Sequence, residues 1–355
     1  MLSAFAGIVL ATIIGPIGSE TPHEPQLASS GSLVVMTFGA GNAVYFSRSQ
    51  DSGRSFSMPV KVGDAPILPL TRHRGPRIVI SGNAIVISAV MGRTPSQEQH
   101  AHGLPSDGDL MVWRSVDGGK SWSYGIVVND VPGAPSEGLH ALAASENGTL
   151  FATWLDKRGG HGTKLYGALS KDGGATWSKN VLIYESPEGT ICECCHPSAA
   201  IAPTGEIEVM FRNCLGGLRD MYLSRSQDGT NFSRPEKLGT GAWYLNACPM
   251  DGGGLAVAGE RTFTAWRREN KLFLAEPGQE EKEIGAGKDI AVATNGRRIY
   301  AIWSGMNGIT LWESGKVAVL AKQGTYPTMS ALPDGGMVAA WEQNGVIEIH
   351  LVNRN

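Results

Sequence analysis

Three features of the sequence predict an all-β fold built from repeated units. An eight-residue pattern, S-x-D-x-G-x-[S/T]-[W/F], occurs at 49–56, 115–122 and 170–177, and a copy one residue shorter occurs at 226–232. Short apolar strands flank these copies, and glycine is abundant, with 47 of 355 residues. A sequence that repeats at such a spacing is typical of an array of one supersecondary unit. Together these observations predict a β-propeller of four-stranded blades.

Each copy of the repeat is predicted to be a turn between two strands. An Asp side chain accepts hydrogen bonds from backbone N–H groups a few residues further on, and glycine adopts a positive φ at little cost. The closing Trp or Phe gives the next strand an apolar anchor. One turn geometry that recurs in several blades is a structural device rather than several active sites. We therefore interpret the four aspartates as structural, namely Asp51, Asp117, Asp172 and Asp228.

A second pattern predicts the number of blades. Seven short apolar strands end near a Trp or another bulky residue, at 32–37, 84–88, 149–154, 206–211, 262–266, 298–303 and 337–341. Each reads as the second strand, B, of a unit of strands A to D, with the repeat in the C–D turn. The last unit lacks a D strand, and we expect a segment around residues 18–28 to complete it, which would protect the sheet edges. No segment has the apolar spacing of a long helix.

The N-terminal segment differs from the rest of the chain. Residues 2–17 form one apolar run, a length that suits the core of a signal peptide. The sequence thus predicts a signal peptide over 1–20 and one propeller domain over 21–355, hence an exported, periplasmic or extracellular protein without a membrane span in its mature form. An apolar N-terminal strand or an uncleaved anchor is the alternative. The net charge of −3 argues against a nucleic-acid partner.

The repeat resembles the Asp box, or BNR repeat, of the sialidase-like β-propellers. A Cys-x-Cys-Cys segment at 192–195 with a later Cys248-Pro249 is similar to bacterial, exported members of unassigned activity. The resemblance implies an exo-α-sialidase or related glycosidase that needs no cofactor and acts on an acidic sugar. A non-catalytic propeller that binds a glycan or a protein is the alternative. Sialidases have six blades, whereas the strand count favours seven. We expect a monomer.

Propeller topology predicts where a ligand would bind. The B–C loops and D–A connections share the face opposite the Asp boxes, and they are rich in arginine, which suits planar anions. The sialidase resemblance implies three arginines on a carboxylate, a Tyr nucleophile with a Glu, and an Asp acid/base. Its Arg-Ile-Pro motif is matched only by Arg77-Ile78 without the Pro. Loop candidates are Arg77, Arg158, Arg212 and Arg267 for binding, with Asp156 and Asp251 for acid/base work; Arg93, Tyr244 and Tyr326 also lie near loops.

All five cysteines fall between residues 192 and 248, and the topology places them on this same face, where blades four and five meet. Three interpretations remain open. Oxidation after export would give two disulfides and one free thiol. Thiolates with His196 and Met250 nearby would suit copper(I) or zinc. Cys192-x-x-Cys195-His196 matches the covalent c-type haem motif. The metal candidates are Cys192, Cys194, Cys195, His196, Cys214 and Cys248.

Overall fold

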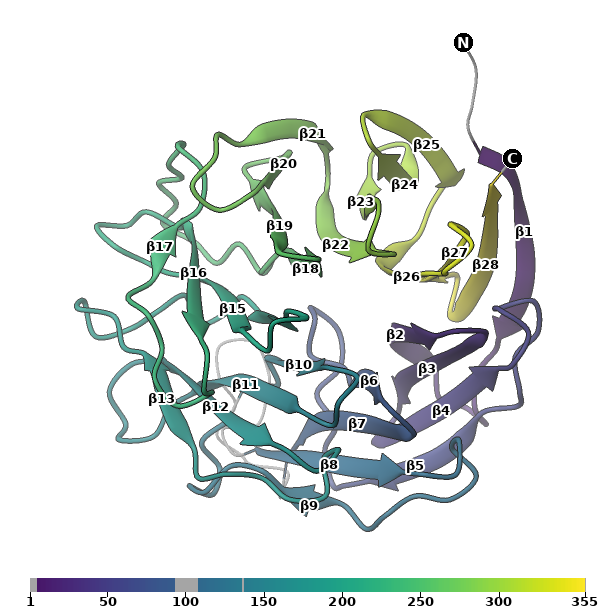
Figure 1. The fold of residues 1–355 in the computed structure, drawn as a ribbon, viewed down its shortest axis with the longest axis horizontal. Coiled ribbons are helices and arrows are strands. Elements are labelled where there is room, and N and C mark those ends of the chain that lie inside the picture. The colour runs from purple at the N-terminus through teal and green to yellow at the C-terminus, as the bar shows by residue number, and fades with distance from the viewer. Residues whose placement is uncertain (1–4, 93–107, 136, 355) are drawn as a thin grey trace.

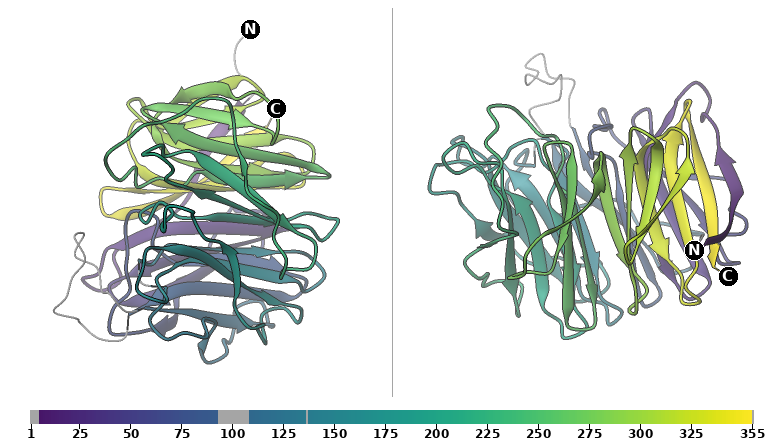
Figure 2. Two further views of the ribbon diagram at one scale, coloured as in Figure 1. Left: turned by 90° about the vertical axis from the view of Figure 1, so that its left-hand side faces the viewer. Right: turned by 90° about the horizontal axis from the view of Figure 1, so that it is seen from above.

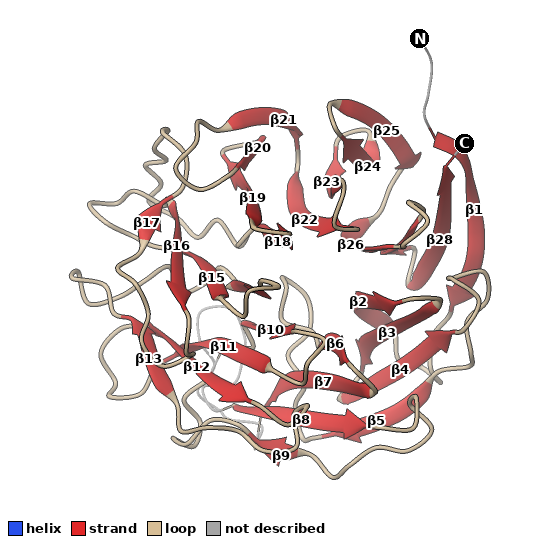
Figure 3. Cartoon of the chain, viewed as in Figure 1, coloured by secondary structure: helices blue, strands red, loops and turns tan. Residues whose placement is uncertain are grey.

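The chain folds into a ring of seven four-stranded antiparallel sheets (Figure 1). This computed structural model describes residues 5–92, 108–135 and 137–354. No helix occurs among them (Figure 3), and none therefore is long and apolar enough to cross a membrane. The predicted all-β propeller with seven blades is confirmed, and six blades are excluded.

Within each of the first four blades, the strands follow one another from the inside of the ring to its rim (Figure 1). Their bounds are β2 (Pro22–Ser30), β3 (Leu33–Ala40), β4 (Ala43–Ser49) and β5 (Val60–Asp64) in blade one; β6 (Arg77–Ser81), β7 (Ala84–Met91), β8 (Asp109–Ser115) and β9 (Ile126–Val127) in blade two; β10 (His140–Ala144), β11 (Leu150–Asp156), β12 (Lys164–Ser170) and β13 (Val181–Tyr184) in blade three; and β14 (Ser198–Ile201), β15 (Ile207–Arg212), β16 (Met221–Ser226) and β17 (Glu236–Lys237) in blade four.

Blades five and six repeat this order, whereas blade seven combines both ends of the chain. The bounds are β18 (Gly254–Ala258), β19 (Arg261–Arg268), β20 (Lys271–Ala275) and β21 (Lys282–Ala286); β22 (Lys288–Thr294), β23 (Ile299–Gly305), β24 (Gly308–Glu313) and β25 (Lys316–Ala321); then β26 (Thr325–Ala331), β27 (Met337–Gln343), β28 (Val346–Arg354) and β1 (Phe5–Ile14).

Strand β1 is the outer strand of blade seven and pairs antiparallel with β28, from Phe5 opposite Arg354 to Ile14 opposite Ile347 (Figure 1). The expectation that residues 18–28 would complete this blade is wrong, because most of that segment lies in β2, the inner strand of blade one. The apolar residues 5–14, predicted to belong to a signal peptide, here occupy that position; residues 1–4 lie outside the described part. The signal peptide itself stays a prediction.

The hydrophobic core is divided into layers, one between each pair of neighbouring blades. Adjacent residues of one strand serve different layers: Val34 packs with Val338 of blade seven, while Val35 packs with Ile85 of blade two. This follows from the two-residue period of a strand, whose successive side chains point to opposite faces of the sheet. Because both faces of each B strand are covered, these strands are apolar at nearly every position. The ring is therefore held together chiefly by contacts between blades.

The four Asp boxes lie in the C–D turns, on one face of the ring. In the first, Asp51 accepts hydrogen bonds from the Ser49 hydroxyl (2.7 Å) and from the Ser55 amide (2.9 Å) and hydroxyl (2.6 Å), and the second and third boxes repeat this pattern. In the fourth, the Asn231 side-chain amide replaces the hydroxyl and donates to Asp228 at 2.7 Å. Each box glycine packs on the preceding blade; a Cβ on Gly119 would lie 2.2 Å from the Phe46 ring of blade one. The boxes thus close their own turns and fit one blade against the next.

Candidate functional site

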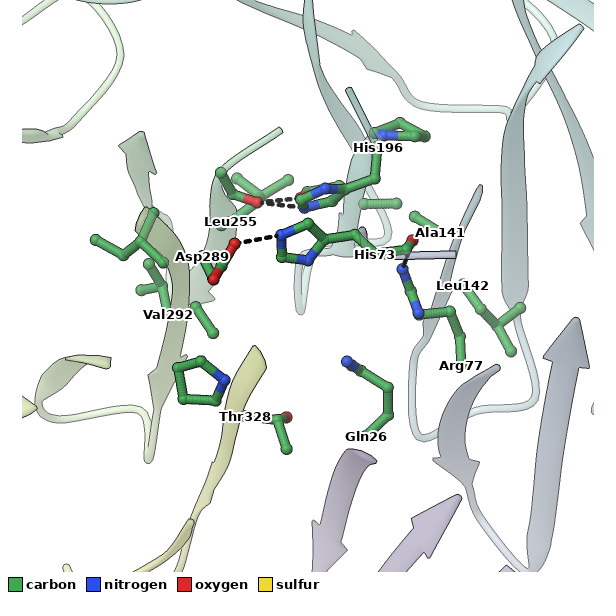
Figure 4. Close-up of a pocket in the computed structure, with 18 residues that line it drawn as sticks. Gln26, His73, Arg77, Ala141, Leu142, His196, Leu255, Asp289, Val292 and Thr328 are labelled. Atoms are coloured by element: carbon green, nitrogen blue, oxygen red, sulfur yellow. Dashed lines mark hydrogen bonds and ion pairs between the residues drawn. The ribbon is translucent and has the colours of Figure 1, made fainter. Parts of the chain in front are cut away.

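The inner strands of all seven blades surround a cavity of about 190 Å³ in the central channel (Figure 4). Figure 2 shows the ring from the side, with the loops at its two faces. The lining side chains come from far apart in the sequence, since each inner strand contributes its own residues. Those with polar groups in the cavity include Gln26, His73, Arg77, His196, Asp289 and Thr328.

Three inner strands carry an irregularity where they begin. The register of β2, β22 and β26 shifts between His23 and Gln26, Lys288 and Ala291, and Thr325 and Thr328, respectively. At these bulges Glu24, Asp289 and Tyr326 adopt positive φ angles of 53°, 58° and 50°. A bulge re-aims a side chain, and non-glycine residues with positive φ occur preferentially at functional sites. Here the three bulges turn their side chains toward one segment, residues 71–75.

That segment leads into blade two and forms a left-handed turn. Thr71, Arg72 and His73 have φ angles of 70°, 55° and 66°. The turn is held by groups from other blades. The Glu24 carboxylate accepts the His73 amide at 2.5 Å and also the Gly75 amide, and the Tyr326 hydroxyl accepts the Arg72 amide at 3.0 Å. Such a conformation costs of order 1–3 kcal/mol per residue and persists only where its surroundings impose it.

His73 lies at the centre of this arrangement. Its Nε2 is 3.0 Å from Asp289 Oδ1, and its ring contacts that of His196 at a centroid distance of 4.3 Å and an interplanar angle of 32° (Figure 4). Burial alone would lower the pKa of His73, but the hydrogen bond and charge of Asp289 outweigh it and raise that pKa. Burial and the nearby His73 cation hold the pKa of His196 well below its usual range. The site therefore favours the protonated form of His73 beside the neutral form of His196.

Two polar atoms of the site have no hydrogen-bond partner among the described residues. His73 Nδ1 makes no hydrogen bond and points into the open cavity (Figure 4). Asp289 Oδ2 is buried without a hydrogen bond, with the Lys288 Nζ at 3.6 Å. Buried polar groups in native proteins usually have hydrogen-bond partners. Polar groups without such partners in a cavity therefore indicate a ligand-binding site.

The four predicted arginines do not converge on one ligand. Arg77 lines the cavity, but its guanidinium donates to the carbonyls of Gly75, Pro76 and His73. Arg158 makes a bidentate pair with Asp156, at 2.9 and 2.8 Å.

Arg212 is 1% exposed and donates to the carbonyls of Asp251, Arg219 and Arg267. Arg267 itself donates to the Pro249 carbonyl at 2.7 Å and lies 3.6 Å from the Asp251 carboxylate. Arg93 lies outside the described residues. Among the four candidate arginines, only Arg77 contacts the cavity.

The two predicted acid/base residues are both buried, and their carboxylates accept hydrogen bonds from protein groups. Asp156 accepts from the Trp154 indole at 2.7 Å as well as from Arg158, so it anchors the end of β11. Asp251 accepts the amides of Gly253 and Asp289, at 3.3 and 3.1 Å. Asp251 thereby supports the neighbouring Asp289 and does not itself line the cavity. Tyr244 is 71% exposed at the surface.

The cysteines divide into a buried trio and two others. Cys192 Sγ lies 3.7 Å from Cys194 Sγ and 3.4 Å from Cys195 Sγ, so no disulfide joins them, and all five cysteines are free. Cys214 is half-buried and Cys248 exposed. His196 faces away from the trio, because its Nε2 donates to the Gly253 carbonyl at 3.0 Å in the channel. The haem motif Cys192-x-x-Cys195-His196 thus has its sulfurs and its imidazole in separate places.

Burial alone would raise the pKa of Cys195. Hydrogen bonds from Cys192 and Cys194, together with the charge of Arg212, outweigh burial and hold that pKa well below its usual range. Met250 packs against the cluster that the three cysteines form.

The sequence interpretation missed Glu24, Asp289 and the role of His73. A local signal exists for some of them: Glu24-Pro25, His196-Pro197 and Tyr326-Pro327 all precede or begin an inner strand. Proline restricts the preceding residue, and it is tolerated in sheets at strand ends and bulges. A recurrent X-Pro at the start of inner strands would therefore have marked these residues as a set. Asp289-Ile290 lacks this signal.

A family model described as "BNR repeat-like domain" matches residues 44–242. No curated protein sequence matches the chain. Solved structures share the fold. An α-L-arabinanase of Penicillium chrysogenum is 13% identical, with a TM-score of 0.58 over 98% of both chains. The BP39L lectin of Burkholderia pseudomallei is 12% identical, with a TM-score of 0.67 over 94% of this chain and 98% of the lectin. An intramolecular trans-sialidase of Ruminococcus gnavus is 10% identical, with a TM-score of 0.53 over 99% and 98%.

Proposed function

This chain belongs to the BNR repeat-like domain family, and from that premise we propose that it is a carbohydrate-active propeller whose channel cavity binds a sugar and cleaves its glycosidic bond. The observation that carries the proposal is the His73–Asp289 pair, which holds an imidazolium at the cavity with Nδ1 open to a ligand. An imidazole held by a carboxylate is a common proton-transfer group of enzymes.

A small sugar group suits the size of the cavity. Its volume of about 190 Å³ lies below the roughly 300–1,000 Å³ of sites for drug-sized ligands, so it fits one sugar residue rather than an oligosaccharide. The arabinanase, the trans-sialidase and a polysaccharide lyase have the same fold, although identities of 10–13% limit that likeness to the fold. These enzymes give the proposal its substrate class.

The charges of the site favour a sugar that carries a carboxylate. The His73 side chain, whose pKa is raised, offers positive charge at the cavity, and Arg77 adds a guanidinium to its wall. Arginine and imidazolium form charge-assisted hydrogen bonds with carboxylates. Exo-α-sialidase activity, which releases a terminal acidic sugar, is therefore the specific reaction that we propose.

In this reaction the His73 Nδ1–H donates its proton to the leaving glycosidic oxygen, and Asp289 stabilises the imidazolium before the transfer. We assign to Tyr326 the nucleophilic role that sialidases give to a tyrosine: its oxygen bonds to the anomeric carbon as the glycosidic bond breaks, and water then hydrolyses this new bond and releases the sugar. The Tyr326 ring contacts His73 edge-on at 5.4 Å, which supports this assignment. Burial raises the pKa of the Tyr326 hydroxyl. A base must therefore take its proton, and the nearby Glu24 carboxylate, whose own pKa is raised by burial, is suited to accept it.

Hydrolysis of fluorogenic glycosides tests the proposal. Wild-type protein should release the fluorophore from an α-sialoside, with an α-L-arabinofuranoside as the neutral comparison substrate. His73→Gln should lower kcat/KM by about 10²–10⁴-fold, the usual contribution of general acid catalysis. His350→Gln is the matched control, because His350 pairs with Glu348 on β28 of blade seven and does not line the cavity. Absence of turnover and of sugar binding by the wild type over pH 4–8 would refute the proposal.

One observation favours a second candidate, a propeller that binds sugars without cleaving them. Most glycosidases need two available carboxyl groups, and here both Glu24 and Asp251 are occupied by backbone amides. A lectin-like protein would bind free sialic acid in calorimetry, lose that binding in His73→Ala, and release no fluorophore. A turnover that depends on His73 would exclude this candidate.

A further inference from the structure

We propose that Cys192, Cys194 and Cys195 bind one thiophilic metal ion, with copper(I) the ion that fits best. The three sulfur atoms all lie within 4.8 Å of one another. This site is separate from the channel cavity, so the inference does not rest on the proposed glycosidase activity.

The sulfur spacing is that of ligands around a common ion. A tetrahedral ion with metal–sulfur bonds of about 2.3 Å separates its sulfurs by about 3.8 Å. The observed distances from Cys192 Sγ are 3.7 Å to Cys194 and 3.4 Å to Cys195, whereas a disulfide requires about 2.05 Å. The sulfurs are thus arranged like one face of a coordination polyhedron.

The surroundings of the trio suit a negatively charged metal–thiolate group. The three cysteine residues are 0–3% exposed. Three thiolates with one copper(I) carry a net charge of −2, and two cations lie beside them: Arg219 donates to Cys192, and Arg212 is close enough to act on Cys195. The Asp251 amide also donates to Cys195. A buried charge needs such partners, and groups that hold the ligands in place tune a metal site.

The available fourth ligand favours copper(I) over zinc. Among the described residues, no further cysteine, histidine or carboxylate joins the trio. The neighbouring His196 is committed to the channel through Gly253. Met250 packs against the cluster of the three cysteines, and its thioether is a soft ligand. Structural zinc sites are almost always closed by four N or S ligands, whereas thiolate and thioether sulfurs select copper(I).

A metal at this position would connect three parts of the ring. The trio lies in the connection between blades three and four, Arg212 ends β15, and Met250 precedes blade five. Its last cysteine, Cys195, is followed directly by His196, whose ring contacts that of His73 in the cavity. The ion would thus fix the loop from which the cavity receives one of its two imidazoles.

Metal titration of the reduced, full-length chain tests the inference. Under anaerobic conditions we expect one equivalent of copper(I) per chain to be retained against a competing chelator, with only sulfur in the first shell of its X-ray absorption spectrum. Cys195→Ser should weaken binding by more than about 100-fold, since even groups that merely orient ligands contribute about 10–100-fold. Cys248→Ser, at an exposed cysteine, is the matched control and should bind like the wild type.

Other outcomes are decisive in the opposite direction. Failure of the wild type to retain either copper(I) or zinc(II) would overturn the proposal, as would equal copper retention by a Cys192/Cys194/Cys195 triple serine variant. A stable disulfide within the trio in anaerobically purified protein, seen as a loss of two hydrogens by mass spectrometry, would overturn it too. Retention of zinc in preference to copper(I) would keep the site and reject the choice of ion. If Cys195→Ser fails to fold, the wild-type stoichiometry and absorption spectrum still decide.

Discussion

His73 and Asp289 are 216 residues apart in the chain, yet His73 Nε2 lies 3.0 Å from Asp289 Oδ1 across the channel. Both residues have positive φ angles, so neither reaches the other by ordinary strand geometry. The pair links the segment before blade two to the first residues of blade six. The pair therefore stabilises the ring across its channel, and it is also the proposed proton-transfer group.

The pair predicts a particular dependence of stability on pH. The folded state raises the pKa of His73 above 6.5 and lowers that of Asp289 below 3.8. The His73 contribution is complete below pH about 6.5 and is lost as pH rises through the raised pKa; the Asp289 contribution is complete above about 3.9 and is lost as pH falls through the lowered pKa. Asp289→Asn should thus lower the free energy of unfolding most near pH 5–6, by about 3–5 kcal/mol.

Urea unfolding of the wild type and Asp289→Asn at pH 5.5 and pH 9 measures this difference. The difference in the free energy of unfolding between the two proteins should be smaller at pH 9 than at pH 5.5. An equal difference at both pH values would show that the charged His73–Asp289 pair does not stabilise the folded state as described.

Gly119→Ala should destabilise the protein more than Gly278→Ala. Both glycines have a positive φ, 84° and 76°, so both substitutions strain the backbone by about 1–2 kcal/mol. Only at Gly119 does the new methyl meet another group, the Phe46 ring at 2.2 Å, whereas nothing lies within 4 Å at Gly278. Overpacking adds about 1–3 kcal/mol. Equal midpoints of thermal unfolding would contradict the packing of the box on blade one.

Asp51→Ala tests the Asp box. Hydrogen bonds from Ser55 and Ser49 lower the pKa of Asp51 to about 2. A lowered pKa gives stability that is present above pH about 3.9 and lost as pH falls through about 2. We expect a cost of about 1 kcal/mol at pH 7, since the carboxylate is exposed and solvent screens it, and a smaller cost at pH 2. Asp64→Ala, which removes only the exposed pair with Lys61, should stay within about 0.5 kcal/mol.

Removal of residues 1–14 tests the role of β1. Without this strand, β28 would present an unpaired edge, and Ile14, which is 4% exposed in the core layer between blades one and seven, would be lost. The shortened chain should unfold at lower denaturant concentration and self-associate through the free edge. Light scattering and urea unfolding measure both effects. The N-terminal residue of exported protein, read by mass spectrometry, separately tests the predicted signal peptide.

The fold could be predicted because its signals are local. An Asp box such as 115–122 contains its own hydrogen-bond partners. The burial of each B strand can be inferred from its apolar composition alone. The closing strand could not be assigned in the same way, because both 5–14 and 22–30 suit a strand, and the choice depends on which edge each one meets.

The site was harder to predict because its contacts are made across the ring. Arg212 resembles an anion-binding residue in sequence, but its partners are backbone carbonyls of segments up to 55 residues away. Asp289 gains its role from a bulge and from a histidine in another blade. Cys195 and His196 are neighbours in sequence but face different sites, so the motif they form did not predict a shared ligand.

The pairing of β1 with β28 has a consequence for biosynthesis. Strand β1 must remain without its partner until β28 has emerged from the ribosome, since Phe5 pairs with Arg354. At about 5–20 residues per second, that delay lasts on the order of 20–70 seconds. The other six blades can pair their strands in the order of their synthesis, whereas blade seven can be completed only after some 340 further residues have been made.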